Sequence, residues 1–164
     1  MISDRLFTLR EEGGSVLILD QTRLPHQYAT RHLNSLADAA HAIRAMLVRG
    51  APLIGVTAAY GMALALKDSA GNKALLQACE TLAATRPTAV NLAWAVDRQL
   101  AAMAAAGHDI DAQIAAATVT AQAIADDAQG FGQETVRDPE RRKEAKNISV
   151  RPSRQDDDPP LAAV

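Results

Sequence analysis

The sequence predicts a mainly α-helical fold, in which a short N-terminal β-hairpin is followed by a bundle of about five helices. Two short apolar runs near the N-terminus flank a pair of glycines, as in a hairpin. From residue 35 to about 128, apolar residues recur at helical spacing, and each break in that pattern carries glycine, proline or both. With 48% hydrophobic and 22% charged residues, the chain can bury a core.

The predicted hairpin pairs residues 5–10 with residues 15–20. Gly13 and Gly14 lie between the two runs, and glycine accepts the positive φ angles that tight turns require. Residues 21–34 are predicted to be an extended connector.

Five helices are predicted after this connector. Ser35 is the expected N-cap of the first, with Asp38 in its first turn. The second should be the central helix of the bundle, because it is apolar on all sides. Asn72 and Asp109 are the expected caps of the third and fifth. Gly50 should end the first helix, and the second should run from Pro52 to about Lys67. The third should carry Leu75, Leu76, Cys79 and Leu82, and the fifth should carry the apolar positions from Ile110 to Ala128. The fourth should start at the segment 86–88, with Val90, Ala93, Val96, Leu100 and Met103 on one face.

The composition changes near residue 134. Residues 134–164 contain 14 charged residues and four of the seven prolines of the chain. A segment of this kind cannot bury enough apolar surface to fold. We therefore expect one helical domain over residues 1–133 and a charged, disordered tail over residues 134–164, with an interaction tail as the alternative.

Composition and charge exclude several classes of function. Aromatic residues make up 3% of the chain and the net charge is -2, so neither a base-stacking surface nor a broad basic field for nucleic acid is expected. The uncharged segment from Ala51 to Leu66 is shorter than the roughly 20 residues that span a bilayer, so no membrane association is expected. The single cysteine fits the reducing cytoplasm. The four histidines show no ligand pairing, and neither a metal nor a cofactor is predicted.

Two segments place an arginine before a helix. In the first, Arg49 and Gly50 precede Ala51 and Pro52; in the second, Arg86 precedes Pro87. The first amides of a helix lack intrahelical acceptors, glycine permits close approach, and a guanidinium matches phosphate or carboxylate. The residues alone leave two interpretations: an anion site, or helix–helix turns that carry solvated arginines.

No catalytic group stands out elsewhere. Cys79 falls at an apolar position within a helix, which indicates a small core residue, with a reactive thiolate as the alternative. Asp126 and Asp127 are interpreted as a solvated helix face.

Six motifs occur in order along the predicted domain: LDQTRLP at 19–25, AIRAMLVRGAP at 42–52, IG at 54–55, AAYG at 58–61, TRPTAVNL at 85–92 and WA at 94–95. Together they resemble the methylthioribose-1-phosphate isomerase family, which is related to the regulatory subunits of the exchange factor for translation initiation factor two. The resemblance implies an N-terminal helical domain, a Rossmann-like C-terminal domain and a homodimer of full-length chains. It also implies that Arg49, Gly50, Ala51 and Arg86 bind a phosphorylated sugar.

The family's catalytic cysteine and aspartate belong to the C-terminal domain, whose motifs are absent here, so no catalytic residue is assigned and Cys79 does not inherit that role. We expect the N-terminal domain of an aldose–ketose isomerase that converts S-methyl-5-thioribose 1-phosphate to S-methyl-5-thioribulose 1-phosphate in L-methionine salvage, truncated and inactive alone. The alternative is a non-catalytic regulatory or interaction domain like the initiation-factor relatives.

Overall fold

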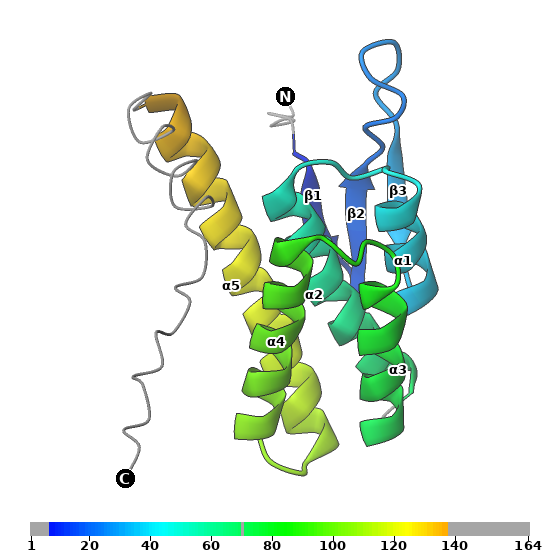
Figure 1. The fold of residues 1–164 in the computed structure, drawn as a ribbon, viewed down its shortest axis with the longest axis vertical. Coiled ribbons are helices and arrows are strands. Elements are labelled where there is room, and N and C mark those ends of the chain that lie inside the picture. The colour runs from blue at the N-terminus through cyan, green and yellow to red at the C-terminus, as the bar shows by residue number, and fades with distance from the viewer. Residues whose placement is uncertain (1–6, 70, 138–164) are drawn as a thin grey trace, which may run out of the picture. The chain divides into compact units, whose positions relative to one another are not determined.

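The computed structural model describes residues 7–69 and 71–137, and the side chains of these residues up to Gln129. Within these ranges the chain forms a three-stranded antiparallel sheet and then five helices (Figure 1). The chain divides into two units, residues 1–129 and 130–164. The last turns of the fifth helix belong to the second unit, and every other described element belongs to the first.

The predicted hairpin is present. β1 (Leu9–Glu12) pairs with β2 (Ser15–Leu19), with Leu9 opposite Ile18 and Glu12 opposite Ser15. Gly13 and Gly14 form the two-residue turn with φ angles of 60° and 86°. Two positive φ angles define a type I′ turn, which matches the twist of the strands it joins.

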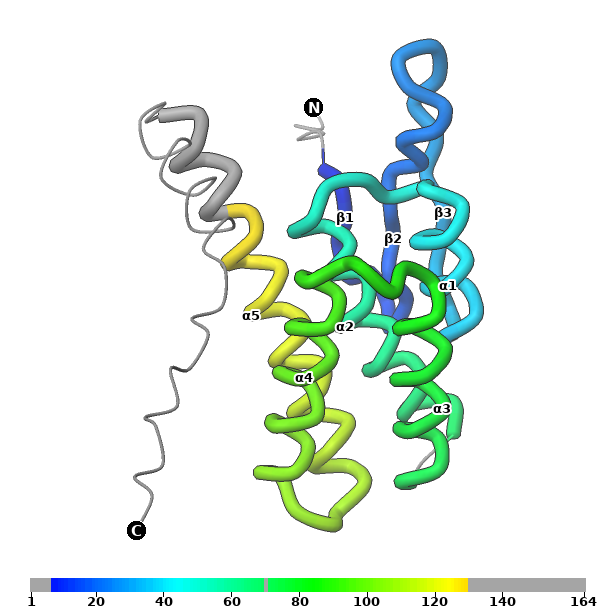
Figure 2. The backbone as a smooth tube through the Cα atoms, viewed as in Figure 1, coloured from blue at the N-terminus to red at the C-terminus, as the bar shows by residue number. Residues whose placement is uncertain are grey.

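The expected extended connector was wrong in its last part, because β3 (Thr30–Leu33) adds a third strand beside β2. Only Leu33 of this strand is buried, so its sequence lacks the apolar alternation that marks a strand. Asp20, directly after β2, stabilises the connection from β2 to β3. Its carboxylate accepts hydrogen bonds from the backbone and hydroxyl of Thr22 and an ion-paired hydrogen bond from Arg31. The loop between β2 and β3 extends beyond the end of the sheet (Figure 2).

The five predicted helices are all present. Ser35 caps the first in a reciprocal capping box with Asp38, and Asp109 accepts a hydrogen bond from the backbone of Asp111 at the start of the fifth. Gly71, with a φ of 114°, takes the cap position that we expected Asn72 to fill. The observed bounds are α1 (Leu36–Arg44), α2 (Ala51–Asp68), α3 (Asn72–Ala83), α4 (Val90–Ala105) and α5 (Ile110–Arg137).

The central position of α2 is confirmed, because every residue from Ile54 to Leu66 is buried. α4 packs along it in the same direction. Near the start of both helices, a Cβ at Gly55 would lie 2.9 Å from the carbonyl oxygen of Asn91. Further along, the side-chain amide of Gln99 donates to the carbonyl oxygen of Ala59 at 3.0 Å.

Two buried polar side chains connect this pair of helices to α5. Gln99 also donates to the carbonyl oxygen of Ala117 at 2.9 Å. The Tyr60 hydroxyl donates to Oε1 of Gln122 at 2.8 Å, and burial raises the pKa of Tyr60 to about 12. The three helices therefore share polar contacts as well as the apolar core.

The predicted face of α4 was partly wrong. Val96 and Met103 are buried, but the side chain of Val90 is 78% exposed and that of Leu100 is 37% exposed. The core side of α4 is instead formed by Leu92, Ala95, Val96, Gln99 and Met103. α4 is apolar around most of its circumference, so periodicity alone does not say which side faces the core.

The predicted boundary between residues 133 and 134 falls within α5, which continues to Arg137. Residues 138–164 of the predicted tail lie outside the described residues, so their disorder stays a prediction. In the described part of the chain, every helix is too short or too polar to be a candidate membrane span.

Candidate functional site

The two arginine-bearing loops lie at the same end of the bundle (Figures 1 and 2). Arg49 belongs to the α1–α2 loop and Arg86 to the α3–α4 loop, and both side chains are exposed. The close approach of Gly55 to Asn91 explains this placement, because it brings the first turns of α2 and α4 together. The structure therefore puts both predicted segments at neighbouring helix N-termini.

The start of α2 has the features expected of an anion site. Gly50 is its N-cap, with a φ of 93° that favours glycine, and a Cβ there would meet no atom within 4 Å. No side chain caps the helix, and Pro52 lacks an N–H group. The amides of Ala51 and Leu53 at the first and third helical positions are therefore free for a ligand.

The start of α4 differs from the prediction. The helix begins at Val90 rather than directly after Arg86 and Pro87, and the backbone of Ala89 donates to the carbonyl oxygen of Arg86 in a turn. Ala89 is the N-cap and provides no side-chain hydrogen bond. Arg86 therefore precedes the free amides of α4 by a full turn of chain, so its guanidinium must reach along the loop to share a ligand with them.

Arg86 lines a pocket of about 230 Å³ between α3 and α4. Most of the lining is apolar, and Cys79 and Asp97 are its other ionisable residues. Arg49 does not line this pocket, nor a second one of about 250 Å³ beside β3 and α1. The two arginines thus share one end of the bundle but no described pocket.

Neither Arg49 nor Arg86 takes part in an ion pair with a described residue. The same holds for Arg23, Arg44 and Lys73, whereas the other described cations, Arg10, Arg31, Lys67 and Arg98, are paired. Both guanidinium groups are consequently available to an anionic ligand.

Cys79 is half-buried, packs against the hydrophobic core and also lines the pocket. Burial raises the pKa of its thiol, with a further contribution from the carboxylate of Asp97, so the thiol is protonated at neutral pH. A reactive thiolate is therefore disfavoured. Asp97 was not singled out from the sequence, because a lone acidic residue on a helix carries no functional signal.

The remaining candidates keep their first interpretation. Asp126 and Asp127 are exposed on α5, and Asp127 pairs with Arg98 at 3.0 Å. His41 is exposed on the polar side of α1 and lines the second pocket together with His32 of β3. No group of three potential metal ligands occurs among the residues that the structure describes.

One end of this helical domain therefore combines two exposed arginines with two helix N-termini that no side chain caps. Residues 47–139 match the model of the Initiation factor 2 subunit family, and the chain belongs to that family. The match begins in the α1–α2 loop and includes Arg49, Gly50, Ala51 and Arg86.

Methylthioribose-1-phosphate isomerase from Rhodospirillum rubrum is 57% identical over 116 residues, which cover 71% of this chain and 29% of that relative. The chain therefore spans less than a third of that relative's length.

Two solved structures share the fold. The first is 5-methylthioribose 1-phosphate isomerase from Pyrococcus horikoshii, with a TM-score of 0.67 and 34% identity over 73% of this chain and 36% of that one. The second is the translation initiation factor eIF-2B, subunit delta, from A. fulgidus, with a TM-score of 0.69 and 31% identity over 75% of this chain and 37% of that one.

Proposed function

We propose that residues 7–129 form the phosphate-binding helical part of a methylthioribose-1-phosphate isomerase. In this proposal Arg49 and Arg86 bind the phosphate of the sugar, and the backbone at Gly50 and Ala51 approaches it closely. The observation that carries the proposal is the position of both arginine loops at one end of the bundle, beside helix starts that no side chain caps. The 57% identity to a relative named for that reaction supports the choice of substrate.

The proposal gives this part of the chain a role in binding and no catalytic residue. Converting the aldose to the ketose moves hydrogen between C2 and C1, either as a proton through an acid/base pair or as a hydride. Near Arg86, the described ionisable residues are Asp97 and Cys79, and the Cys79 thiol is protonated. We therefore propose that this chain binds and positions the sugar phosphate in the cytoplasm. In this proposal the hydrogen transfer takes place on groups outside the chain. The homodimer implied by the resemblance applies to full-length members.

A second candidate function is a non-catalytic regulatory domain. It is favoured by the similarity to the eIF-2B subunit and by the name of the matching family. Binding of the sugar phosphate separates the two candidate functions. The first proposal predicts sugar-phosphate binding by this chain without ketose formation, whereas a regulatory domain would bind no sugar phosphate.

The test is calorimetric titration of the full chain with S-methyl-5-thioribose 1-phosphate. Arg49→Ala and Arg86→Ala should each weaken binding by about tenfold or more, since a charge-assisted contact contributes about 1.5–3 kcal/mol. Lys73→Ala is the matched control. Lys73 is an exposed cation at the start of α3, at the other end of the bundle (Figure 1), and its loss should leave the affinity unchanged. Equal losses in all three variants would show only a general charge effect and contradict the proposal.

A further inference from the structure

The connection from β2 to β3 contacts the loop that carries Arg49. The backbone N–H of Gln21 donates a hydrogen bond to the carbonyl oxygen of Leu47 at 2.9 Å. Leu47 lies in the α1–α2 loop, two residues before Arg49. In the described part of the chain, no other backbone hydrogen bond joins this loop to a segment outside the two helices that it connects. The residues after β2 are therefore placed to hold the candidate anion site.

Asp20 fixes the chain directly before Gln21. Its side chain is buried, and Oδ1 accepts hydrogen bonds from the backbone N–H of Thr22 at 3.0 Å and from the Thr22 hydroxyl at 2.5 Å. Oδ2 accepts a hydrogen bond from Nε of Arg31 at 3.1 Å, and the backbone N–H of Asp20 donates to the carbonyl oxygen of Ala29 at 2.8 Å. Contacts from both sides of the connection thus hold one conformation at this point.

We propose that Asp20 is a positioning residue for the candidate anion site, because it holds Gln21 where the Gln21 N–H fixes the α1–α2 loop, and so sets the positions of Arg49 and the free amide of Ala51. This role rests on the proposed function of Arg49 as a phosphate ligand. Ordering a loop on binding costs free energy, so a loop already held in its binding conformation binds more tightly. Hydrogen bonds behind the residues that contact a ligand provide that order.

The contact acts at the right place in the loop. Leu47 and Val48 are buried and hold this part of the loop against the core, whereas Arg49 and Gly50, which follow, are exposed. The hydrogen bond from Gln21 is made to the buried part, just before the exposed arginine. This role also gives a function to the motif at 19–25, which the phosphate contacts themselves do not use.

Asp20→Asn tests this role without a large change in shape. An asparagine has one acceptor oxygen, so its NH₂ group would face either the donors of Thr22 or the guanidinium of Arg31. The substitution also removes one negative charge, which by itself would strengthen the binding of an anion. A weaker affinity for phosphate in this variant is therefore opposite in sign to a general charge effect.

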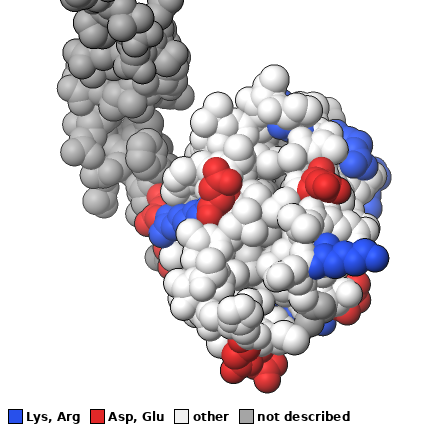
Figure 3. Space-filling model, turned by 60° about the horizontal axis from the view of Figure 1, so that its bottom comes forward, with Lys and Arg blue, Asp and Glu red and all other residues white. Residues whose placement is uncertain are grey.

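Asp38→Asn is the matched control, because it makes the same change of charge elsewhere. Asp38 accepts hydrogen bonds from the backbone of Asn34 and Ser35, at the end of α1 away from the α1–α2 loop. Figure 3, which views the molecule from its lower end, shows few charged side chains on a broad surface. We therefore expect the phosphate to bind at the arginine loops in every variant.

The full chain is measured first without ligand and then with it. An amide ¹H–¹⁵N spectrum of the ligand-free chain should show shifts at Leu47, Arg49 and Gly50 in Asp20→Asn, and none there in Asp38→Asn. Calorimetric titration with S-methyl-5-thioribose 1-phosphate should give a dissociation constant about fivefold or more higher for Asp20→Asn. The constant for Asp38→Asn should be unchanged or lower.

A second pair of variants tests the hydroxyl that Asp20 accepts from. Thr22 is exposed, so little packing changes when it is replaced. Thr22→Val removes the hydroxyl and should move the same loop amides and weaken binding, whereas Thr22→Ser keeps the hydroxyl and should match the parent chain. Circular dichroism confirms that each variant is folded, and this pair decides the matter if Asp20→Asn does not fold.

Three results would overturn the role of Asp20: loop amides that stay in place in Asp20→Asn, an unchanged affinity for the sugar phosphate in that variant, or a Thr22→Ser variant as weak as Thr22→Val. A parent chain that binds no sugar phosphate would instead overturn the proposed function. The ligand-free spectra would then still decide whether Asp20 positions the α1–α2 loop.

Discussion

Gly55 of α2 lies directly against the backbone of Asn91 in α4, since a Cβ at Gly55 would stand 2.9 Å from the Asn91 carbonyl oxygen. Real Cβ atoms do not approach that closely, and a backbone oxygen held in a helix cannot turn aside. This contact fixes the distance between the first turns of the two helices, and with it the positions of the two arginine loops.

We predict that Gly55→Ala lowers the free energy of unfolding by about 1–3 kcal/mol, because the added methyl group must force α2 and α4 apart. Gly61→Ala is the comparison. Its Cβ would meet the Ala39 methyl group at 3.0 Å and the movable Leu82 side chain at 3.4 Å, so the loss should be smaller. Chemical denaturation measures both. A Gly55→Ala variant as stable as the parent chain would show that the helices are not held in contact there.

We predict that Asp20 makes the free energy of unfolding depend on pH in the acidic range. The hydrogen bond from the Thr22 hydroxyl is the main cause that lowers the pKa of this carboxyl below its usual value, and Arg31 adds to it. Because the folded-state pKa lies below the unfolded one of about 3.9, the carboxylate adds stability above that pH and loses it as the pH falls through the folded value.

Asp20→Asn should therefore destabilise the chain by about 1–3 kcal/mol at neutral pH. The difference from the parent chain should shrink steadily below about pH 4, where the parent carboxyl becomes protonated. Thermal melts at a series of pH values measure it. A difference that stayed constant down to pH 2 would mean that the charge of Asp20 is not what the loop requires.

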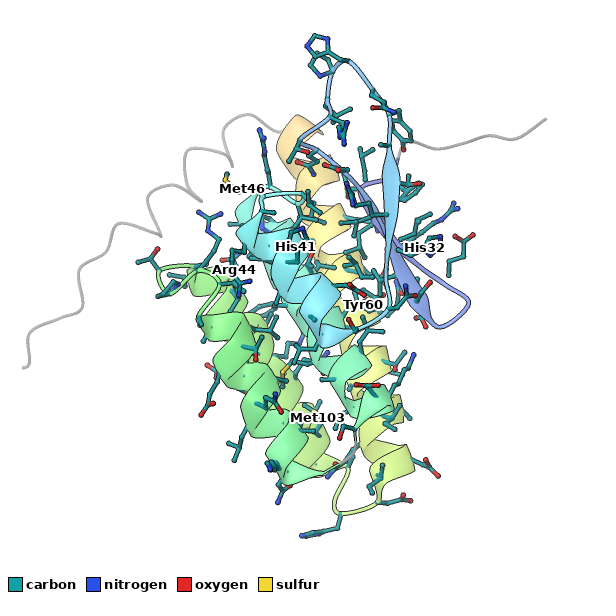
Figure 4. The ribbon with its side chains drawn as sticks, turned by 90° about the vertical axis from the view of Figure 1, so that its right-hand side faces the viewer. His32, His41, Arg44, Met46, Tyr60 and Met103 are labelled. Carbon is teal, nitrogen blue, oxygen red and sulfur yellow. The ribbon has the colours of Figure 1, made fainter. Side chains whose placement is uncertain are left out.

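Met46 stores backbone strain in the α1–α2 loop. Its φ is 59°, a left-handed value that favours glycine, and it follows α1 in a helix-terminating motif in which the backbone of Leu47 donates to Ala42 at 2.9 Å. Its side chain is 46% exposed, and Figure 4 shows it at the upper end of α1. Little packing would be lost by removing it.

Met46→Gly should therefore raise the free energy of unfolding by about 0.5–1 kcal/mol. Gly107→Ala tests the same effect in reverse: Gly107 has a φ of 83° and open space around it, so the variant should lose a similar amount. Both changes are measured by denaturant titration, and a destabilised Met46→Gly variant would show that the methionine side chain makes a contact worth more than its strain.

The local features of this fold follow from sequence, because they depend on residues close together in the chain. The cap at Ser35, the Gly13–Gly14 turn and the fully buried α2 were all predicted for that reason. β3 was missed because only Leu33 of its four residues is buried, so the strand carries no apolar alternation. The exposure of Val90 was missed because α4 is apolar on more than one side.

The residues of the candidate site were predicted from the sequence, but their spatial arrangement was not. Arg49, Gly50, Ala51 and Arg86 were chosen from motifs and helix starts, yet their relation depends on α2 and α4 running in the same direction. The close contact between Gly55 and Asn91 brings the first turns of the two helices together, and no local pattern reveals a contact between residues so far apart in the chain.

We propose that the N-termini of α2 and α4 hold one phosphate group between them. The most direct measurement is an amide ¹H–¹⁵N spectrum of the full chain titrated with S-methyl-5-thioribose 1-phosphate. The largest shifts should appear together, with one common dissociation constant, at the amides of Gly50 and Ala51 and at those of Arg86 and Val90. Shifts confined to one of the two loops, or two sets that titrate with different constants, would contradict it.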